Sequence, residues 1–355
     1  MKDLRFGVIL SDLFSASKAV RLGVLADKLG FDSIWVTDHI VDIDGARMDP
    51  WTVLAAIGVQ TKNVLLSPGV TDPYRCHPSK IAHIVATLDE ITDGRAALGI
   101  STGEAMNLIP FGINFEEARQ RLERLREAIE VVKLLWTANR KETANYNGRY
   151  YSLNQAFIDQ PTTQKPHPPV YVGAFRSPTL MELTGELGDG WFPWVNTPET
   201  YSKCIESISA GARKAGRRPE EIDAATWFYS TISEDLKVQA GAVEAGKSIL
   251  FLEKTILRST GFEVTYPHYQ HLLATHPFKT YAELRRAARE VPEKPVQETL
   301  MIGGPDECIE FIERFIHVGA RHICFRIMSF PGSPSIEDTL KTLSQKIIPH
   351  LKENR

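Results

Sequence analysis

Short hydrophobic runs alternate with longer stretches in which apolar residues recur every three or four positions, almost from one end of the chain to the other. The short runs are rich in β-branched and aromatic residues, which predicts β-strands, and the longer stretches have the periodicity of helices with one buried face. Eight runs of the strand type are FGVIL, SIWVT, VLLSPGV, AALGI, PPVYV, GWFPW, ATWFYSTI and HICFRI. The chain therefore repeats a strand–helix unit.

Helical patterns follow the first three strands over residues 16–29, 50–60 and 78–91, and a longer one spans Leu122 to Leu135. Alternating strands and helices imply parallel strands with helical crossovers, and eight strands favour closure into a barrel. The alternative is a Rossmann-like sheet, but FGVILSDLFSASKA has no second glycine in the first turn. We therefore expect an α/β fold, a (β/α)8 TIM barrel.

Two segments interrupt the alternation. Residues 139–168, with NGRYYSL and the proline-rich QPTTQKPHPP, predict a small hairpin and an extended lead-in after the fourth strand. Residues 234–295 predict a helical, charged insertion after the seventh strand, and such insertions usually cover the active-site face of a barrel. With 355 residues, we expect one domain that spans 1–355.

The composition and charge of the chain limit the classes of partner that it could bind. A formal charge of −3 and the absence of a long basic run argue against nucleic acid, and the apolar runs are too short for a membrane span. The start of the chain has no signal-peptide core, so we expect a cytoplasmic protein with a small-molecule substrate. The four cysteines form no CxxC pair, and His268 and His271 have no carboxylate cluster nearby, so we assign neither a disulfide nor a metal.

Polar residues at the carboxyl ends of barrel strands are expected to build the active site. The second strand ends in WVTDHI, which places Asp38 and His39 at such an end, although a helix cap and a surface imidazole would explain them equally well. In the third strand, Gly69 precedes Val70, and a glycine inside a strand often marks a close approach to a ligand. We expect a planar ring to stack there, so that bulk at Gly69 would collide with it.

The fourth strand ends in GISTGEAMN. Thr102 and Gly103 offer a hydroxyl group and an open backbone for a polar cofactor, Glu104 offers a carboxyl group at the barrel mouth, and Asn107 follows one helical turn later. A glycine–acid pair after a strand is common, so this motif supports a cofactor site only together with the motifs at the other strand ends.

The fifth strand is followed by VGAFRSPTL. Gly173 and Ala174 leave backbone N–H groups accessible, Ser177 resembles a helix cap, and Arg176 could pair with a phosphate. The alternative is a loop that Ser177 caps for stability alone. We interpret this stretch as a phosphate-binding loop.

Several segments together resemble the luciferase-like superfamily, in order and over nearly the whole chain: GFDSIWVTDH, GVTDPYRCHPSKIAHIVATLDEITDGRAALGISTGEAMN, QKPHPPVYVGAFRSPTLMELTGELGDGW and GGPDECIEFIERFIHVGARHICF. Within it, GEAMN resembles the dehydrogenases that use coenzyme F420 for secondary alcohols or glucose 6-phosphate, and GVTDPY resembles methylenetetrahydromethanopterin reductase. The resemblance favours F420 over FMN as the cofactor and implies a homodimer packed through the early helices.

The resemblance also implies roles for the candidate residues. The bond between Gly69 and Val70 would be a non-prolyl cis peptide behind the deazaflavin ring, and His39 and Glu104 would be the catalytic pair. The remaining positions would contact the cofactor or, from Gly173 onward, its phosphate: Asp38, Thr102, Gly103, Asn107, Gly173, Ala174, Arg176 and Ser177.

Three departures from the pattern leave the substrate open. No tryptophan stands between His39 and Trp51, where the dehydrogenases have one, Asn196 stands near the place of the sugar-phosphate enzymes' lysine, and Ile9 stands where the reductase has a glutamate. The leading hypothesis is hydride transfer between C5 of F420 and a small organic or C1-carrier substrate. The alternatives are an FMN-dependent monooxygenase and a non-enzymatic barrel that carries or senses the cofactor.

Overall fold

A computed structural model of the protein describes residues 4–10, 15–42, 48–174, 176–251, 254–259, 262, 283 and 286–353. Its main sheet has the strand order β3-β2-β1-β11-β9-β8-β7-β4, with every pair parallel. These strands are β1 (Arg5–Leu10), β2 (Ser33–Val36), β3 (Leu65–Pro68), β4 (Leu98–Ile100), β7 (Val170–Gly173), β8 (Gly190–Phe192), β9 (Asp223–Ile232) and β11 (His322–Ile327).

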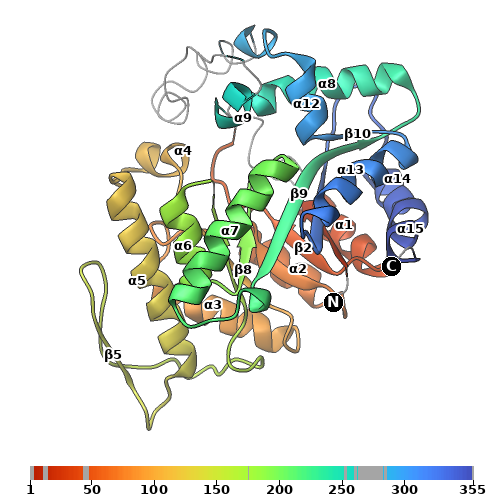
Figure 1. Ribbon diagram of the computed structural model, residues 1–355. Coiled ribbons are helices and arrows are strands. Elements are labelled where there is room, and N and C mark those ends of the chain that lie inside the picture. The colour runs from red at the N-terminus through yellow and green to blue at the C-terminus, as the bar shows by residue number, and fades with distance from the viewer. Residues whose placement is uncertain are drawn as a thin grey trace.

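Two bridges close this sheet on itself. Leu66 pairs with Ala96 and Thr71 with Ile100, so β3 and β4 meet and the eight strands form a nearly closed barrel (Figure 1). The predicted TIM barrel is therefore confirmed, and each of its strands lies on a run that the sequence indicated.

Helices surround the barrel, and several begin with a polar cap followed by proline, which has a helical φ and needs no hydrogen bond at the first position. This signal opens α2, α3, α6 and α7. The helices are α1 (Ala16–Lys28), α2 (Pro50–Gly58), α3 (Pro78–Ile91), α4 (Ala105–Leu108), α5 (Ala118–Thr137), α6 (Pro178–Leu187), α7 (Pro198–Lys214), α8 (Leu236–Leu250), α9 (Lys254–Ser259), α12 (Glu293–Thr299), α13 (Pro305–His317), α14 (Ile336–Thr342) and α15 (Ile348–Glu353). Among the residues described, no helix is long and apolar enough to cross a membrane.

The two interruptions contain the elements expected of them. The first holds an antiparallel hairpin of β5 (Ala144–Asn147) and β6 (Ser152–Ala156). The second holds α8, α9 and α12, which gather at the end of the barrel toward which β9 points (Figure 1). It is followed by β10 (Met301–Gly303), which pairs with the last residues of β9 and was not predicted. His268 and His271 lie outside the described residues.

Alternation along the strands divides the core in two. On β11, Ile323 and Phe325 pack in the larger cluster beneath the helices, whereas Cys324 belongs to a second cluster inside the barrel. Trp35 and Phe192 fill that interior with stacked rings whose centroids lie 4.1 Å apart. The barrel is therefore packed with side chains and has no open pore.

A buried polar network closes the amino-terminal end of the barrel. Its members are the first or second residues of their strands. Asp223 accepts hydrogen bonds from the Tyr171 hydroxyl at 2.6 Å and from His322 Nδ1 at 2.9 Å, and it also pairs with Arg5. His322 Nε2 lies 2.7 Å from Ser33 Oγ. The network thus pairs Arg5, Asp223 and His322 with one another and with polar groups.

Burial alone would lower the pKa of His322, but the neighbouring Cys324 sulfur and the Asp223 carboxylate raise it to about 9. The pKa of Asp223 is held well below its ordinary value because His322 and Arg5 outweigh the effect of its burial. The network is therefore ionised at neutral pH and contributes to stability.

Candidate active site

His39 and Glu104 come together at the carboxyl ends of β2 and β4. His39 Nε2 lies 3.3 Å from Glu104 Oε2, and the two side chains are 17% and 28% exposed, so the pair faces the barrel mouth without being immersed in solvent. A histidine beside a carboxylate can hold a proton between them and pass it to a bound molecule. The structure thus joins the two residues that the sequence proposed as catalytic.

Asn107, one turn beyond Glu104 on α4, fixes the relation between the two loops. Its side-chain oxygen accepts hydrogen bonds from the backbone N–H groups of Ile40 at 2.8 Å and Val41 at 3.0 Å. Its amide nitrogen donates to Glu104 Oε2 at 3.3 Å, and the residue is buried. Asn107 was expected at the cofactor, and the contacts found for it here are with the protein.

Asp38, the other candidate from β2, pairs with an arginine that the sequence had not singled out. Arg75 Nη1 lies 3.0 Å from the Asp38 carboxylate, and Arg75 Nε lies 2.5 Å from Asp72. Burial raises the pKa of Asp38 above its ordinary value, although Arg75 opposes that shift. Asp72 also accepts from the backbone N–H groups of Tyr74 and Arg75, so the turn DPYR aims the guanidinium at Asp38.

The peptide bond between Gly69 and Val70 is cis, as the resemblance implied. A Cβ atom on Gly69 would lie 3.3 Å from Trp35 Cβ and from the Phe192 ring, inside the barrel. A larger residue at Gly69 would therefore crowd Trp35 and Phe192 in the barrel interior, and its collision with a cofactor ring stays a prediction.

Val70 instead occupies space that a glycine on β7 leaves open. A Cβ atom on Gly173 would lie 2.5 Å from Val70 Cγ2 and 3.1 Å from Ser101 Cβ. The Ser101 hydroxyl donates to the Gly173 carbonyl at 2.5 Å, which ties the ends of β4 and β7 together. Three neighbouring strand ends are thus built around the Val70 side chain.

The loop between β4 and Glu104 depends on Gly103, whose φ of +75° lies in the left-handed region that favours glycine. A Cβ atom there would also lie 3.0 Å from Leu108 and 3.3 Å from the Tyr74 ring. Thr102 is half-buried beside it. The tight turn brings Glu104 back over the barrel.

The segment after β7 opens α6 as the sequence predicted, with Ser177 as the cap and Pro178 in the first turn. The Ser177 side chain lies 3.1 Å from Thr179 Oγ1 and forms no capping bond to the helix backbone. The Ala174 N–H points to the Phe192 carbonyl at 3.4 Å. Arg176 Nη1 donates to the Val195 carbonyl at 2.6 Å, a protein contact in place of the phosphate contact foreseen for it.

A further charged residue, Asp42, reaches His39, and Arg326 lies next to Asp42; the sequence analysis missed both. His39 Nδ1 lies 3.4 Å from Asp42 Oδ2, and Arg326 Nη2 lies 3.8 Å from the same oxygen. Arg326 could have been found from its position on β11. It follows His322 and Cys324 at intervals of two residues, so it faces the barrel interior as they do. Asp42 carried no signal, since only the closed barrel brings it to Arg326.

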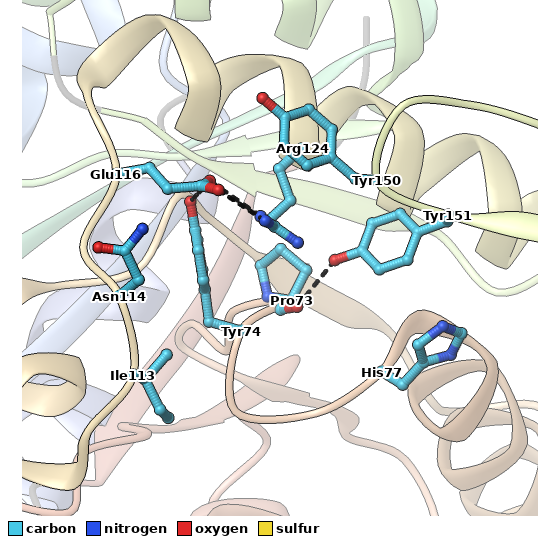
Figure 2. A pocket seen from close by; sticks show the side chains of 9 residues that line it. All are labelled: Pro73, Tyr74, His77, Ile113, Asn114, Glu116, Arg124, Tyr150 and Tyr151. Atoms are coloured by element: carbon cyan, nitrogen blue, oxygen red, sulfur yellow. Dashed lines mark hydrogen bonds and ion pairs between the residues drawn. The ribbon is translucent and has the colours of Figure 1, made fainter.

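A cavity formed by described residues lies outside this acid–base site (Figure 2). It measures about 420 Å³ and is lined by Pro73, Tyr74, His77, Ile113, Asn114, Glu116, Arg124, Tyr150 and Tyr151. Arg124 stacks over the rings of Tyr74 and Tyr150 at 4.8 Å and 4.4 Å and pairs with Glu116 at 2.7 Å. The chain's own arginine fills this aromatic cage, so the cavity wall ties the hairpin to the loop after β3.

A parallel barrel with a histidine–carboxylate pair at the carboxyl ends of its strands has the architecture of a TIM-barrel enzyme. Comparison with known proteins identifies its kind. The model of the luciferase-like monooxygenase family matches residues 5–322, and the chain belongs to this family.

Relatives match this chain over nearly its whole length. The F420-dependent glucose-6-phosphate dehydrogenase of Microbacterium testaceum (strain StLB037) is 31% identical over 99% of this chain and 98% of its own. The 5,10-methylenetetrahydromethanopterin reductase of Archaeoglobus fulgidus is 27% identical, over 92% of this chain and 94% of its own.

Solved structures agree on the fold. The coenzyme F420-dependent tetrahydromethanopterin reductase from Methanopyrus kandleri superimposes with a TM-score of 0.80 at 25% identity, covering 98% of this chain and 99% of that one. An F420-dependent secondary alcohol dehydrogenase in complex with an F420–acetone adduct also gives 0.80, at 24% identity and the same coverage.

Proposed function

We propose that the protein is a coenzyme F420-dependent oxidoreductase that transfers a hydride between the deazaflavin C5 and a small organic or C1-carrier substrate. The observation that carries the proposal is the His39–Glu104 pair, 3.3 Å apart at the carboxyl ends of the barrel strands. The F420-dependent relatives, which align over almost the entire chain, support it.

The strand ends fit such a cofactor. Gly173 leaves the space that the Val70 side chain occupies, and the ring would lie against Val70. The first N–H groups of α6 are not capped by Ser177, so they would hold the phosphate of the cofactor tail, and the Ala174 N–H would join them only by leaving the Phe192 carbonyl.

Asp38, Thr102 and Asn107 border the same mouth and would complete the cofactor site. Arg176 would add to the phosphate site only by turning from the Val195 carbonyl. When bound, the deazaflavin supplies two-electron hydride chemistry, and the protein supplies orientation and proton transfer.

The chain's own residues would manage the proton. Two unprotonated acceptors do not face each other favourably, so a proton between His39 Nε2 and Glu104 Oε2 would make their contact attractive. That proton is placed to exchange with the heteroatom of a bound substrate, and Asn107 keeps both loops in register for the exchange.

Glucose 6-phosphate is not the substrate we propose, although a relative acts on it. Asn196 is buried, donates to the Trp194 carbonyl at 2.9 Å and accepts from Thr200 Oγ1 at 3.2 Å, so it serves the turn before α7. It provides no cationic clamp for a sugar phosphate. We further propose a cytoplasmic homodimer, which sedimentation at working concentration would test.

Cofactor binding tests the proposal directly. The protein, freed of bound small molecules, is titrated with oxidised F420 and separately with FMN, and fluorescence quenching gives each Kd. We expect F420 to bind at least about tenfold more tightly, a difference of about 1.4 kcal/mol. Tight FMN binding with no F420 binding would instead support an FMN-dependent monooxygenase. Binding of neither would remove the proposal.

A further inference from the structure

A charged side chain lies inside the barrel, near the carboxyl ends of its strands. Arg326, on β11, pairs in register with Tyr229 on β9, and its guanidinium lies 5.2 Å from the centre of the Tyr229 ring. The residue is only 9% exposed. Burying a guanidinium raises the free energy of the folded protein unless a carboxylate pairs with it. Arg326 therefore holds a carboxylate close to itself.

That partner is Asp42, which follows His39 by three residues. Asp42 Oδ2 lies between two cations or potential cations, 3.8 Å from Arg326 Nη2 and 3.4 Å from His39 Nδ1. The Asp42 side chain is 15% exposed, so its attraction to both neighbours is poorly screened by solvent. The Asp42 carboxylate thereby links Arg326, on strand β11, to the ring of His39.

His39 is consequently flanked by two carboxylates, one at each ring nitrogen. Nδ1 faces Asp42 at 3.4 Å, and Nε2 faces Glu104 at 3.3 Å. Each gap needs a proton to be attractive. The two protons are not equivalent, because Arg326 stabilises the negative charge of Asp42 and holds the Nδ1 proton in place, whereas Glu104 lies at the mouth.

We infer that Asp42, held by Arg326, is a positioning residue that fixes the ring orientation of His39 and keeps its Nε2 directed at Glu104. Without Asp42, a half-turn of the ring about its Cβ–Cγ bond would place the carbons Cδ2 and Cε1 where Nδ1 and Nε2 now face the two carboxylates. The effect on catalysis rests on the proposed function, but the effect on the ring does not.

The first arm of the test needs neither substrate nor cofactor. Proton NMR of the full chain should contain a downfield, exchange-protected Nδ1 proton of His39, assigned by its loss in His39→Gln. Asp42→Asn is nearly isosteric, keeps the fold and should shift that resonance upfield or broaden it. The matched control is Asp159→Asn, which breaks the exposed pair between Asp159 and Arg140, 2.7 Å apart, and should leave the resonance unchanged. An unchanged resonance in Asp42→Asn would overturn the inference.

The second arm uses turnover with F420 and its substrate. Asp42→Asn should lower kcat about 10- to 100-fold, the range expected for losing an interaction with a charged group, while KM and the Kd for F420 stay within about twofold. Because Arg326 acts through Asp42, Asp42→Asn combined with Arg326→Gln should be no slower than Asp42→Asn alone.

Independent, multiplicative losses in the double variant, or an unchanged kcat in Asp42→Asn, would also overturn the inference. The two proposals fail separately. If no F420 turnover is found in the parent protein, the proposed function fails and the NMR arm still decides the role of Asp42.

Discussion

Gly173→Ala tests whether Val70 lies against the cofactor. The new Cβ would be 2.5 Å from Val70 Cγ2, whereas carbon atoms pack best at about 3.5–4.0 Å, so Val70 must move by about 1 Å. Overpacking of this kind costs about 1–3 kcal/mol, which for a chain of this length lowers Tm by roughly 1–4 °C. If the ring rests on Val70, the displacement should also raise the Kd for F420 about tenfold, which corresponds to about 1.4 kcal/mol.

The assay pairs thermal unfolding with fluorescence titration of F420. Val70→Ala removes both Cγ atoms, so the combination of Gly173→Ala and Val70→Ala should recover most of the lost Tm and leave only the 3.1 Å contact with Ser101 Cβ. Val70→Ala alone is the control for lost contact with the ring. A lowered Tm with an unchanged Kd would refute the reasoning, because Val70 would then serve packing only.

Three further predictions concern catalysis and stability. His39→Ala and Glu104→Gln should each lower kcat by roughly 10²- to 10⁴-fold with little change in F420 affinity, and equal losses in affinity would point to a structural role. The pKa of His322 in the folded protein is raised to about 9 from 6.5, so its stabilising contribution is complete below pH 6.5 and is lost as the pH rises to about 9. His322→Gln should therefore flatten the fall in unfolding free energy over that range in urea denaturation, and a parallel curve would contradict this. Arg124→Ala should cost about 1–2 kcal/mol through its lost ring contacts and pair with Glu116, a Tm decrease of roughly 1–3 °C, whereas an unchanged Tm would mean the aromatic cage is dispensable.

The fold was predictable because alternation and helical periodicity are local. Helix α3 begins and ends where its pattern does, from Pro78 to Ile91, since a cap and proline mark its start. The strand β10 was not predicted because it is formed by pairing with β9, a contact that local sequence does not encode.

The site was predictable only in part. His39 and Glu104 could be proposed because each follows a buried strand and such ends converge in a barrel. The residues around this pair come together only when the barrel forms. Arg326, on β11, meets Asp42 because β11 pairs with β1 and β1 pairs with β2. The direction of a side chain at Gly69 likewise depends on the backbone at the bond to Val70, which composition does not reveal.

The most direct test of the central claim is turnover with F420 itself. The protein is incubated without oxygen with oxidised F420 and a panel of small alcohols and reduced pterin C1 carriers, and with reduced F420 and the corresponding carbonyl and methylene compounds. The visible absorbance of the deazaflavin reports its redox state. The account predicts that at least one pair of substrates changes this absorbance, and that Glu104→Gln abolishes most of the change. No change with any pair, together with oxygen-dependent turnover of an aldehyde by the protein with reduced FMN, would contradict it.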